Sequence, residues 1–291
     1  KIVDAHPFSR AADIAKEEQA RGTPEAGYVK VAGGGREITP EYLRECVGSR
    51  FSGKKKTRRK GGKGDSVVSS LPHVDSWSSF LALLKILERY GCVVASPNDK
   101  YAVTMKGDLV GAINWDNPLL ATSLLGLTWD LSSKADEKNA ERIREAVAQM
   151  SVGDAAAFAS LVVAEHSGGG EYYEPKRKGG EDDDSPFSQA LAGAMKAASK
   201  LGKTQSSEAV DLSENPCSVS TALVLASRLW AEGSDFEDCQ AATGMQAGDL
   251  ARALTRVGDV LRQWSDVVDG DFKAVALKAR DSVLREPVIE T

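Results

Sequence analysis

The feature that most constrains this chain is a helix with two different faces near its C-terminal end. Between Ala247 and Trp264, the apolar residues follow the 4, 3, 4, 3 spacing of one helical seam: Leu250, Leu254, Val257, Leu261 and Trp264. A second stripe lies about 200° away at roughly 100° per residue, and it is polar: Arg252, Arg256, Asp259 and Gln263. The seam predicts burial in a core. The stripe predicts either a solvated face or a row of donors and acceptors for a ligand.

The helix before it has a recognisable start signal. Ser234-Asp235-Phe236-Glu237 has the form of a capping box, in which a hydroxyl and a Glu satisfy orphan N–H groups. We therefore expect one helix over Asp235–Ala242, a break at Thr243-Gly244, and then the two-faced helix.

The composition is typical of a helix-rich globular protein. The chain has 291 residues, of which 42% are hydrophobic and 6% aromatic, and this length suffices for two domains with their own cores. No apolar run approaches the roughly 18 residues of a membrane span, and no signal-peptide pattern is present. Because the chain begins at Lys1 rather than Met, we expect a fragment or a processed product.

Cysteine and histidine usage argues against metal or triad chemistry. The four cysteines are scattered without C-x-x-C spacing, which favours a reducing intracellular compartment and no metal site. The three histidines lie far apart and outside any H-E-x-x-H context. Gly202-Lys203-Thr204 is not a P-loop, because Ala197 stands where the motif needs Gly and a helix, not a strand, precedes it. We expect no self-sufficient enzyme, and no catalytic residues.

Charge is distributed unevenly along the chain. Net charge is −5, but residues 1–64 carry 15 Lys and Arg against 8 Asp and Glu, while the rest carries 22 against 34. Much of the excess comes from one Gly-flanked run: Lys54, Lys55, Lys56, Arg58, Arg59 and Lys60. This run is either a solubilising linker or an auxiliary RNA-contacting arm, and any polybasic segment fits both readings.

The predicted fold is mainly α. Residues 1–65 are predicted to be an irregular segment with a basic linker, and one interpretation of this segment is the end of an inserted domain. Residues 66–134 are predicted to form a small α/β unit, and residues 135–291 a helical bundle. The α/β unit should contain the helix Trp77–Tyr90, a hairpin turning at Lys106-Gly107-Asp108 between strands Tyr101–Met105 and Leu109–Asn114, and the helix Leu119–Leu127. Bundle helices are expected at Asp136–Met150, Asp154–His166, Phe187–Leu201, Ser218–Ala231, Asp235–Ala242, Ala247–Trp264 and Phe272–Leu284, with a surface loop at Ser167–Ser185.

Two stretches resemble one family, the C-terminal DSHCT region of superkiller/exosome-type DExH-box RNA helicases. In the first, Leu84–Val93 followed by Val103–Ile113 is similar to the family's "vLerLGyi … v-lKGrvA-ei" run. In the second, Leu229–Phe236 (LWAEGSDF) resembles W-A-x-G-x-x-F, and Ala247–Gln263 resembles "EGsliRxxrRLeElLrq". Near the end, Ala279–Val283 (ARDSV) stands where the family has "kRDIV". The resemblance covers about residues 77–291, and it rests on the order and spacing of these short motifs rather than on any single motif.

The chain departs from the family pattern in three ways. Ala247 replaces a Glu, Gly258 replaces one of two acidic residues after Arg256, and the family's S-L-Y ending is absent. The tail Arg285-Glu286-Pro287-Val288 is instead similar to the plant-chloroplast and cyanobacterial branch, which implies a chloroplast location.

The resemblance implies a helical bundle that guides single-stranded RNA for a motor built from two RecA-like domains, in RNA processing or decay. ATP and Mg are cofactors of that implied parent helicase, and no cofactor is expected in this chain. The family's ratchet helix matches Ala247–Trp264, so the implied RNA contacts are Arg252, Arg256, Asp259 and Gln263, with Arg256 and Asp259 as the ratchet pair. The motor domains of the same protein, RNA-processing or ribosomal proteins, and single-stranded RNA are the implied partners, and no membrane is.

Other interpretations remain open. Arg252, Arg256 and Asp259 have the spacing of an ordinary surface ion-pair set. For Arg280 and Asp281, a buried or interdomain salt bridge is favoured over RNA contact, and Lys106 is read as a turn residue. The chain as a whole also fits a non-catalytic helical module that binds protein partners, or a helix-turn-helix over Ser234–Trp264, which the acidic surroundings disfavour.

Overall fold

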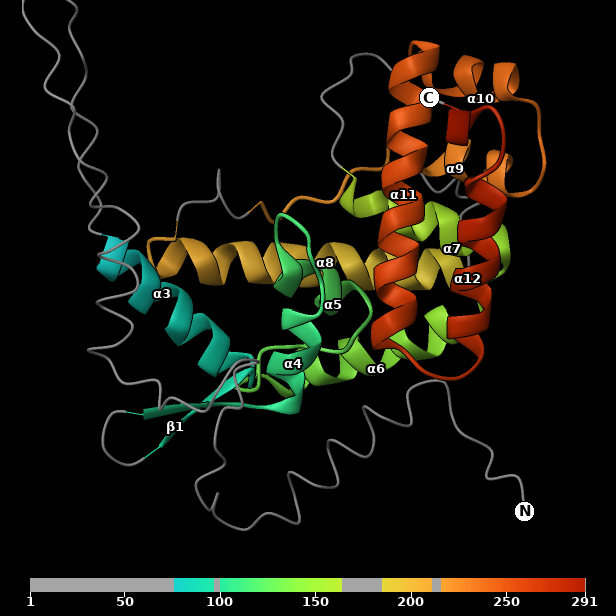
Figure 1. Cartoon of the computed structure of the whole chain (residues 1–291). Coiled ribbons are helices and arrows are strands. Elements are labelled where there is room, and N and C mark those ends of the chain that lie inside the picture. The colour runs from blue at the N-terminus through green and yellow to red at the C-terminus, as the bar shows by residue number, and fades with distance from the viewer. Residues whose placement is uncertain (1–75, 97–99, 164–184, 211–215, 291) are drawn as a thin grey trace, which may run out of the picture.

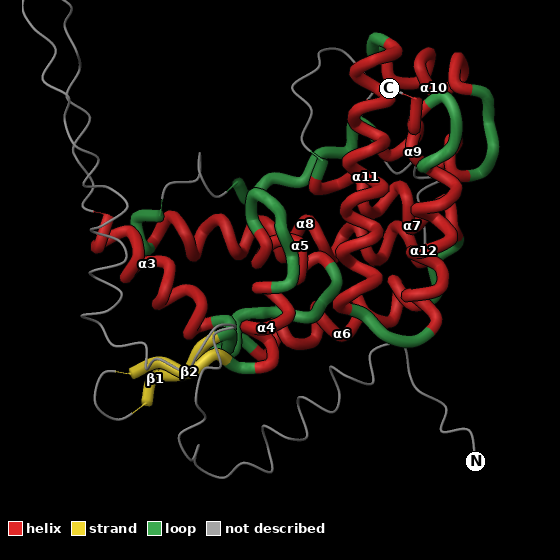
Figure 2. The backbone as a smooth tube through the Cα atoms, in the orientation of Figure 1, coloured by secondary structure: helices red, strands yellow, loops and turns green. Residues whose placement is uncertain are grey.

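The computed structural model describes residues 76–96, 100–163, 185–210 and 216–290, and within them the chain is mostly helical (Figures 1 and 2). The strands in this part form one two-stranded sheet. The mainly α fold is therefore confirmed. None of the described helices is long and apolar enough to cross a membrane. The basic run and the expected surface loop fall outside the described residues.

The N-terminal part of the described chain contains three helices and a small hairpin, which contacts α3 and α4. Its elements are α3 (Ser76–Arg89), β1 (Val93–Ser96), β2 (Lys100–Val103), α4 (Met105–Gly111) and α5 (Pro118–Leu124). The strands are antiparallel, with Val93 opposite Val103. Asn117 caps α5 by accepting from the Leu120 N–H, and Pro118 occupies the first turn, where no donor is lost.

The hairpin predicted around Lys106-Gly107-Asp108 is wrong in position. A hairpin exists, but its strands are β1 and β2, and the three residues lie in α4. The Thr104 side chain accepts from the Gly107 N–H and so starts a helix where alternation had suggested a strand. Gly107 also packs against the Cys92 backbone so closely that a Cβ could not be accommodated. Lys106 is accordingly not a turn residue: it is buried, with its ammonium 3.8 Å from the centre of the Trp129 ring.

The rest of the described chain forms the helical bundle. Its elements are α6 (Lys134–Ala148), α7 (Val152–Ala159), η1 (Ser160–Val162), α8 (Pro186–Ser207), α9 (Val224–Ala231), α10 (Phe236–Thr243), α11 (Ala247–Val267), α12 (Asp271–Val283) and η2 (Val288–Glu290). All the expected bundle helices are present. Two are shorter than expected, because α9 begins only at Val224 and α7 ends at Ala159 in a 3-10 turn. Helices α11 and α12 lie side by side, and α6 packs along α8 (Figure 1).

Serine side chains begin three of the bundle helices, but not the one expected. Ser133, Ser151 and Ser185 each accept a backbone N–H at a helix start, and Ser151 forms a full capping box with Asp154. The capping box predicted at Ser234–Glu237 is wrong: α10 starts at Phe236 with Asp235 at its N-cap, and no side chain caps it. The carbonyl oxygen of Ser234 instead accepts from Arg285 at 2.7 Å, so this corner is held by the C-terminal segment.

One continuous buried cluster joins the two parts. It includes Ile86 of α3, Leu124 of α5 and Trp264 of α11. Trp230 is buried and donates from Nε1 to the Val283 carbonyl oxygen at 2.8 Å. Phe236 is only partly buried and meets the Trp230 ring edge-on, with the ring centres 5.5 Å apart. The boundary placed near residue 134 from sequence stays a prediction, since apolar packing is continuous across it.

The two buried tryptophans should respond differently to substitution by Phe. Trp230→Phe leaves the Val283 carbonyl oxygen without its donor, whereas the indole N–H of Trp264 has no hydrogen-bond partner among the described residues. We expect Trp230→Phe to lower the free energy of unfolding by about 1–2 kcal/mol more than Trp264→Phe does. Urea denaturation of both variants measures the difference, and equal losses would contradict the assigned bond.

Asp130 should make the fold acid-sensitive. Its side chain is fully buried and accepts from Arg89 Nε at 2.8 Å and Ser132 Oγ at 2.6 Å. Burial alone raises the pKa of this carboxyl group, but the hydrogen bonds from Arg89 and Ser132 outweigh it and hold the pKa at about 2. Because the folded pKa lies below the unfolded value, the stabilisation is present above about pH 4 and is lost as pH falls toward 2.

We therefore expect Asp130→Asn to cost at least about 2 kcal/mol at pH 7 and to flatten the loss of stability between pH 4 and pH 2. Asp281→Asn is the matched control, because this carboxylate pairs with Arg280 while 67% exposed and should cost under about 0.5 kcal/mol. Urea melts at a series of pH values test both. If the free energy of unfolding of Asp130→Asn falls between pH 4 and pH 2 as steeply as that of the unsubstituted protein, Asp130 is not the source of the acid sensitivity.

Candidate nucleic-acid interface

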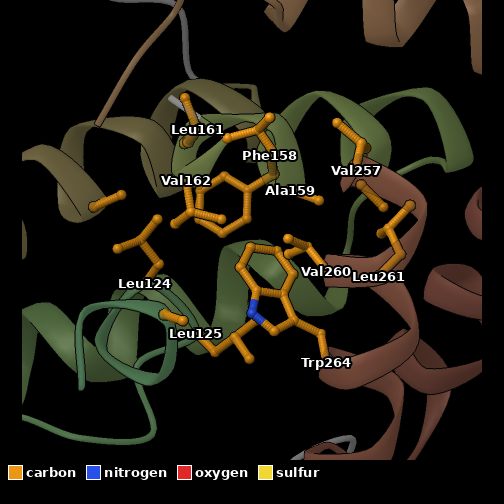
Figure 3. Packing of buried hydrophobic residues seen from close by; sticks show 14 of the residues in the cluster. Leu124, Leu125, Phe158, Ala159, Leu161, Val162, Val257, Val260, Leu261 and Trp264 are labelled. Carbon is orange, nitrogen blue, oxygen red and sulfur yellow. The ribbon is translucent and has the colours of Figure 1, made fainter. Parts of the chain in front are cut away.

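Helix α11 is fixed in rotation by its apolar seam. Leu250, Leu254, Val257, Leu261 and Trp264 are all fully buried. Figure 3 shows Val257, Val260, Leu261 and Trp264 directed from α11 toward Phe158, Leu161 and Val162, and the rings of Phe158 and Trp264 lie 5.7 Å apart. Burying this seam is favourable by roughly 1.5–3 kcal/mol for each large side chain. The helix cannot rotate without exposing it, so the polar stripe is held on the opposite side.

Packing against the C-terminal segment explains a departure from the family pattern. Gly258 is buried, and a Cβ at this position would lie 2.7 Å from Leu284 Cδ2. An acidic side chain here would force the Leu284 side chain to move. Of the two acidic positions after Arg256 in the family pattern, Asp259 is the one retained, and it is exposed.

Arg256 is held at the surface by the loop between α4 and α5. Its guanidinium carbon lies 5.1 Å from the centre of the Trp115 ring, and Nη2 lies 3.9 Å from Asp116 Oδ2. The Trp115 indole N–H donates to the Val162 carbonyl oxygen at 3.1 Å, which fixes the ring. The Arg256 side chain is 36% exposed. The arrangement presents a positive, planar group of restricted orientation to solvent.

The other two charged members of the stripe are freely accessible. The Arg252 side chain is 71% exposed and lies 3.4 Å from Asp249 one turn earlier, an ion pair with a residue outside the set considered from the sequence. Asp259 is exposed as well. An exposed pair of this kind contributes little to stability, so Arg252 can exchange Asp249 for another anion at small cost.

Gln263 is placed differently from the expectation. It continues the stripe, but it is 7% exposed, and its Oε1 accepts from the Asn114 N–H at 2.6 Å. The α4–α5 loop crosses α11 at this point and covers the end of the stripe. Gln263 therefore ties the loop to the helix and is not accessible to a ligand, unlike the other three residues. Arg252, Arg256 and Asp259 as RNA contacts stay a prediction.

The sequence reading missed the contribution of Asn114, Trp115 and Asp116. These residues are far from α11 in sequence and were assigned in part to a strand. The available signal was a large aromatic residue inside a polar stretch before Asn117-Pro118, a helix start. Which helix such a loop contacts depends on tertiary packing.

Two further sequence-based assignments can be compared with the structure. Arg280 and Asp281 do form an ion pair, at 2.6 Å, but the pair is not buried, since the side chains are 32% and 67% exposed. An interdomain role for the pair stays a prediction. The basic residues Lys54, Lys55, Lys56, Arg58, Arg59 and Lys60 lie outside the described part of the chain. Within the described part, no group of three or more His, Cys, Asp or Glu side chains is arranged to hold a metal ion.

The structural role of Gln263 can be measured directly. Gln263→Leu keeps the size of the side chain but removes the acceptor, so the part-buried hydrogen bond from the Asn114 N–H is lost. We expect a loss of about 1 kcal/mol and faster hydrogen exchange at the Asn114 amide. Asp259→Ala on the exposed side of the same helix should change neither quantity. Unchanged exchange at Asn114 in Gln263→Leu would mean that the loop is held by other contacts.

Comparison with known proteins identifies the bundle. Residues 140–291, just over half of the chain, match the DSHCT (NUC185) domain, which is typical of superkiller-like DExH helicases. A search of curated proteins finds no significant match. The matched region starts within α6, close to the boundary expected at residue 135, and contains α11 and the Arg280–Asp281 pair. The order of motifs, the helical bundle and the domain match agree: the chain belongs to the DSHCT (NUC185) domain family.

Proposed function

We propose that this chain is the C-terminal RNA-guiding module of an ATP-dependent DExH-box RNA helicase that acts in RNA processing or decay. The observation that carries the proposal is Arg256: within a DSHCT domain, a guanidinium fixed by Trp115 and Asp116 stands on the exposed face of α11. Arg252 and Asp259 lie on the same face of the helix. Together they offer charge, hydrogen-bond donors and an acceptor to a single strand.

The chemistry of these groups suits single-stranded RNA. A guanidinium can stack on an unpaired base or donate two hydrogen bonds to a phosphate. The carboxylate of Asp259 can accept from the edge of a base, and Arg252 and Arg256 are four residues apart, about 6 Å along the helix axis. Because Trp115 and Asp116 already restrict the Arg256 side chain, little conformational entropy is lost when it binds.

The proposal also includes the ATP-hydrolysing motor of the helicase. In the proposed helicase, two RecA-like domains bind ATP and Mg and hydrolyse the nucleotide, and α11 holds the strand between steps. The chain contributes no catalytic residue to that reaction. The basic run from Lys54 to Lys60 is a candidate auxiliary contact to RNA, and a chloroplast location is proposed from the tail Arg285-Glu286-Pro287-Val288.

The test is Arg256→Ala in the full-length helicase. We expect RNA unwinding to slow by about tenfold, the loss of one stacking or phosphate contact, while ATP binding is unchanged. Arg262→Ala is the matched control, since Arg262 is exposed on α11 but pairs with Asp266 away from the stripe. Strand-displacement kinetics and nucleotide binding are the measurements, and normal unwinding by Arg256→Ala would refute the role of α11.

A second variant separates the two RNA contacts. Deleting residues 54–63 removes the basic run and leaves α11 intact. If this deletion abolishes binding of single-stranded RNA while Arg256→Ala has no effect, the basic run is the contact and the α11 proposal fails.

The alternative function is a helical module that binds a protein of an RNA-processing or ribosome-associated assembly. One observation favours it as an additional role: a groove between α6 and α8, on helices other than α11.

A further inference from the structure

A groove of about 700 Å³ lies between α6 and α8 and extends under the turn Thr128–Asp130. The two helices pack directly where Gly193 meets Ile143, and Asn139 donates to the Gly193 carbonyl oxygen at 3.0 Å. The groove follows this contact on its outer side. Its size is in the range of sites that enclose a compact ligand or a short peptide segment.

The rim of the groove is positively charged. Five cationic residues line it, and four of them form no ion pair with a described residue: Lys138, Arg142, Lys196 and Lys203. The fifth, Lys200, lies 3.7 Å from each of the two lining carboxylates, Asp130 and Asp136. Asp130 is further neutralised by Arg89. The net positive rim is unusual for a chain whose overall charge is −5, and it favours an acidic ligand.

The floor of the groove is apolar. Met195 is 53% exposed and lies in the lining beside the exposed Ala135, while Trp129 and Ala197 are partly buried there. A flexible, exposed Met among charged side chains is characteristic of surfaces that adapt to apolar side chains of a partner. On α8 the lining runs from Met195 to Lys203, about 12 Å at 1.5 Å per residue, or a little over two helical turns.

From these features we infer that the α6–α8 groove binds a short amphipathic helix of a partner protein, with acidic residues flanking an apolar stripe. The stripe covers Met195 and Ala197, and the acidic residues meet the four rim cations. An apolar floor favours a peptide over RNA, because contacts to a phosphate backbone need cations but no exposed Met. The inference is independent of RNA binding by α11.

The test uses the whole 291-residue chain and a defined probe. The probe is a fluorescein-labelled peptide with Leu at i, i+3, i+4 and i+7 and Glu elsewhere, held helical by a side-chain staple so that helix formation costs little. Fluorescence anisotropy should show saturable binding. A permuted peptide of the same composition, without a continuous apolar stripe, should bind at least about tenfold more weakly.

Two variants and two controls locate the site. Lys196→Glu combined with Lys203→Glu should weaken binding at least about tenfold through charge, and Met195→Ser about fivefold through lost apolar contact. Lys278→Glu on α12 and Leu225→Ser on α9 are the matched controls, since both residues are exposed outside the groove. All five substitutions are at exposed helix positions, and circular dichroism checks that each of the four variants retains the fold.

Three results would overturn the inference. The first is no binding of the stapled probe. The second is equal binding of the permuted peptide, which would reduce the groove to a charged patch. The third is competitive displacement of the probe by polyuridylate that depends on Lys196 and Lys203, which would assign the groove to nucleic acid.

Discussion

Burial of the α11 seam is the constraint on which the rest of the bundle depends. Trp264, Leu261 and Val257 fill the space between α5, α7 and η1, and the buried Gly258 brings α11 into contact with Leu284 after α12. Because close-packed side chains of this size allow one rotation of the helix, they also determine where Arg252, Arg256 and Asp259 point. Burial of the apolar face of α11 thus determines the direction in which its polar face points.

The α4–α5 loop adds what the helix alone does not supply. It contacts α11 through Gln263 and Arg256, and it contacts η1 through the Trp115 indole. The small α/β unit is therefore joined to the bundle at the face proposed to guide RNA. One consequence is that the orientation of Arg256 depends on residues about 140 positions earlier. A further consequence is that the stripe is shorter than its sequence period, ending where the loop covers Gln263.

The two proposed surfaces offer different side chains, and each set suits its proposed ligand. The α11 face offers one restrained guanidinium with an exposed carboxylate nearby, an arrangement suited to unpaired bases and phosphates. The α6–α8 groove combines unpaired cations with an exposed Met and an apolar floor, an arrangement suited to a peptide. They lie on different helices, so the two proposed ligands would not compete for the same surface.

By itself the sequence determined the helices of the bundle and the buried face of α11. The 3.6-residue period of apolar side chains sufficed for the seam of α11, because that seam depends on local spacing. Start signals were less reliable: Ser234 matched a capping box but does not cap α10, and Thr104 was not recognised as the cap of α4. Short capping motifs can be overridden by tertiary contacts. Here these contacts are the hydrogen bond from Arg285 to the Ser234 carbonyl oxygen and the close approach of Gly107 to the Cys92 backbone. Only the tertiary structure decided that Gln263 is covered, that Trp115 and Asp116 hold Arg256, and that α6 and α8 enclose a basic groove. These features join residues far apart in the chain, and no local period encodes which loop or helix will meet which.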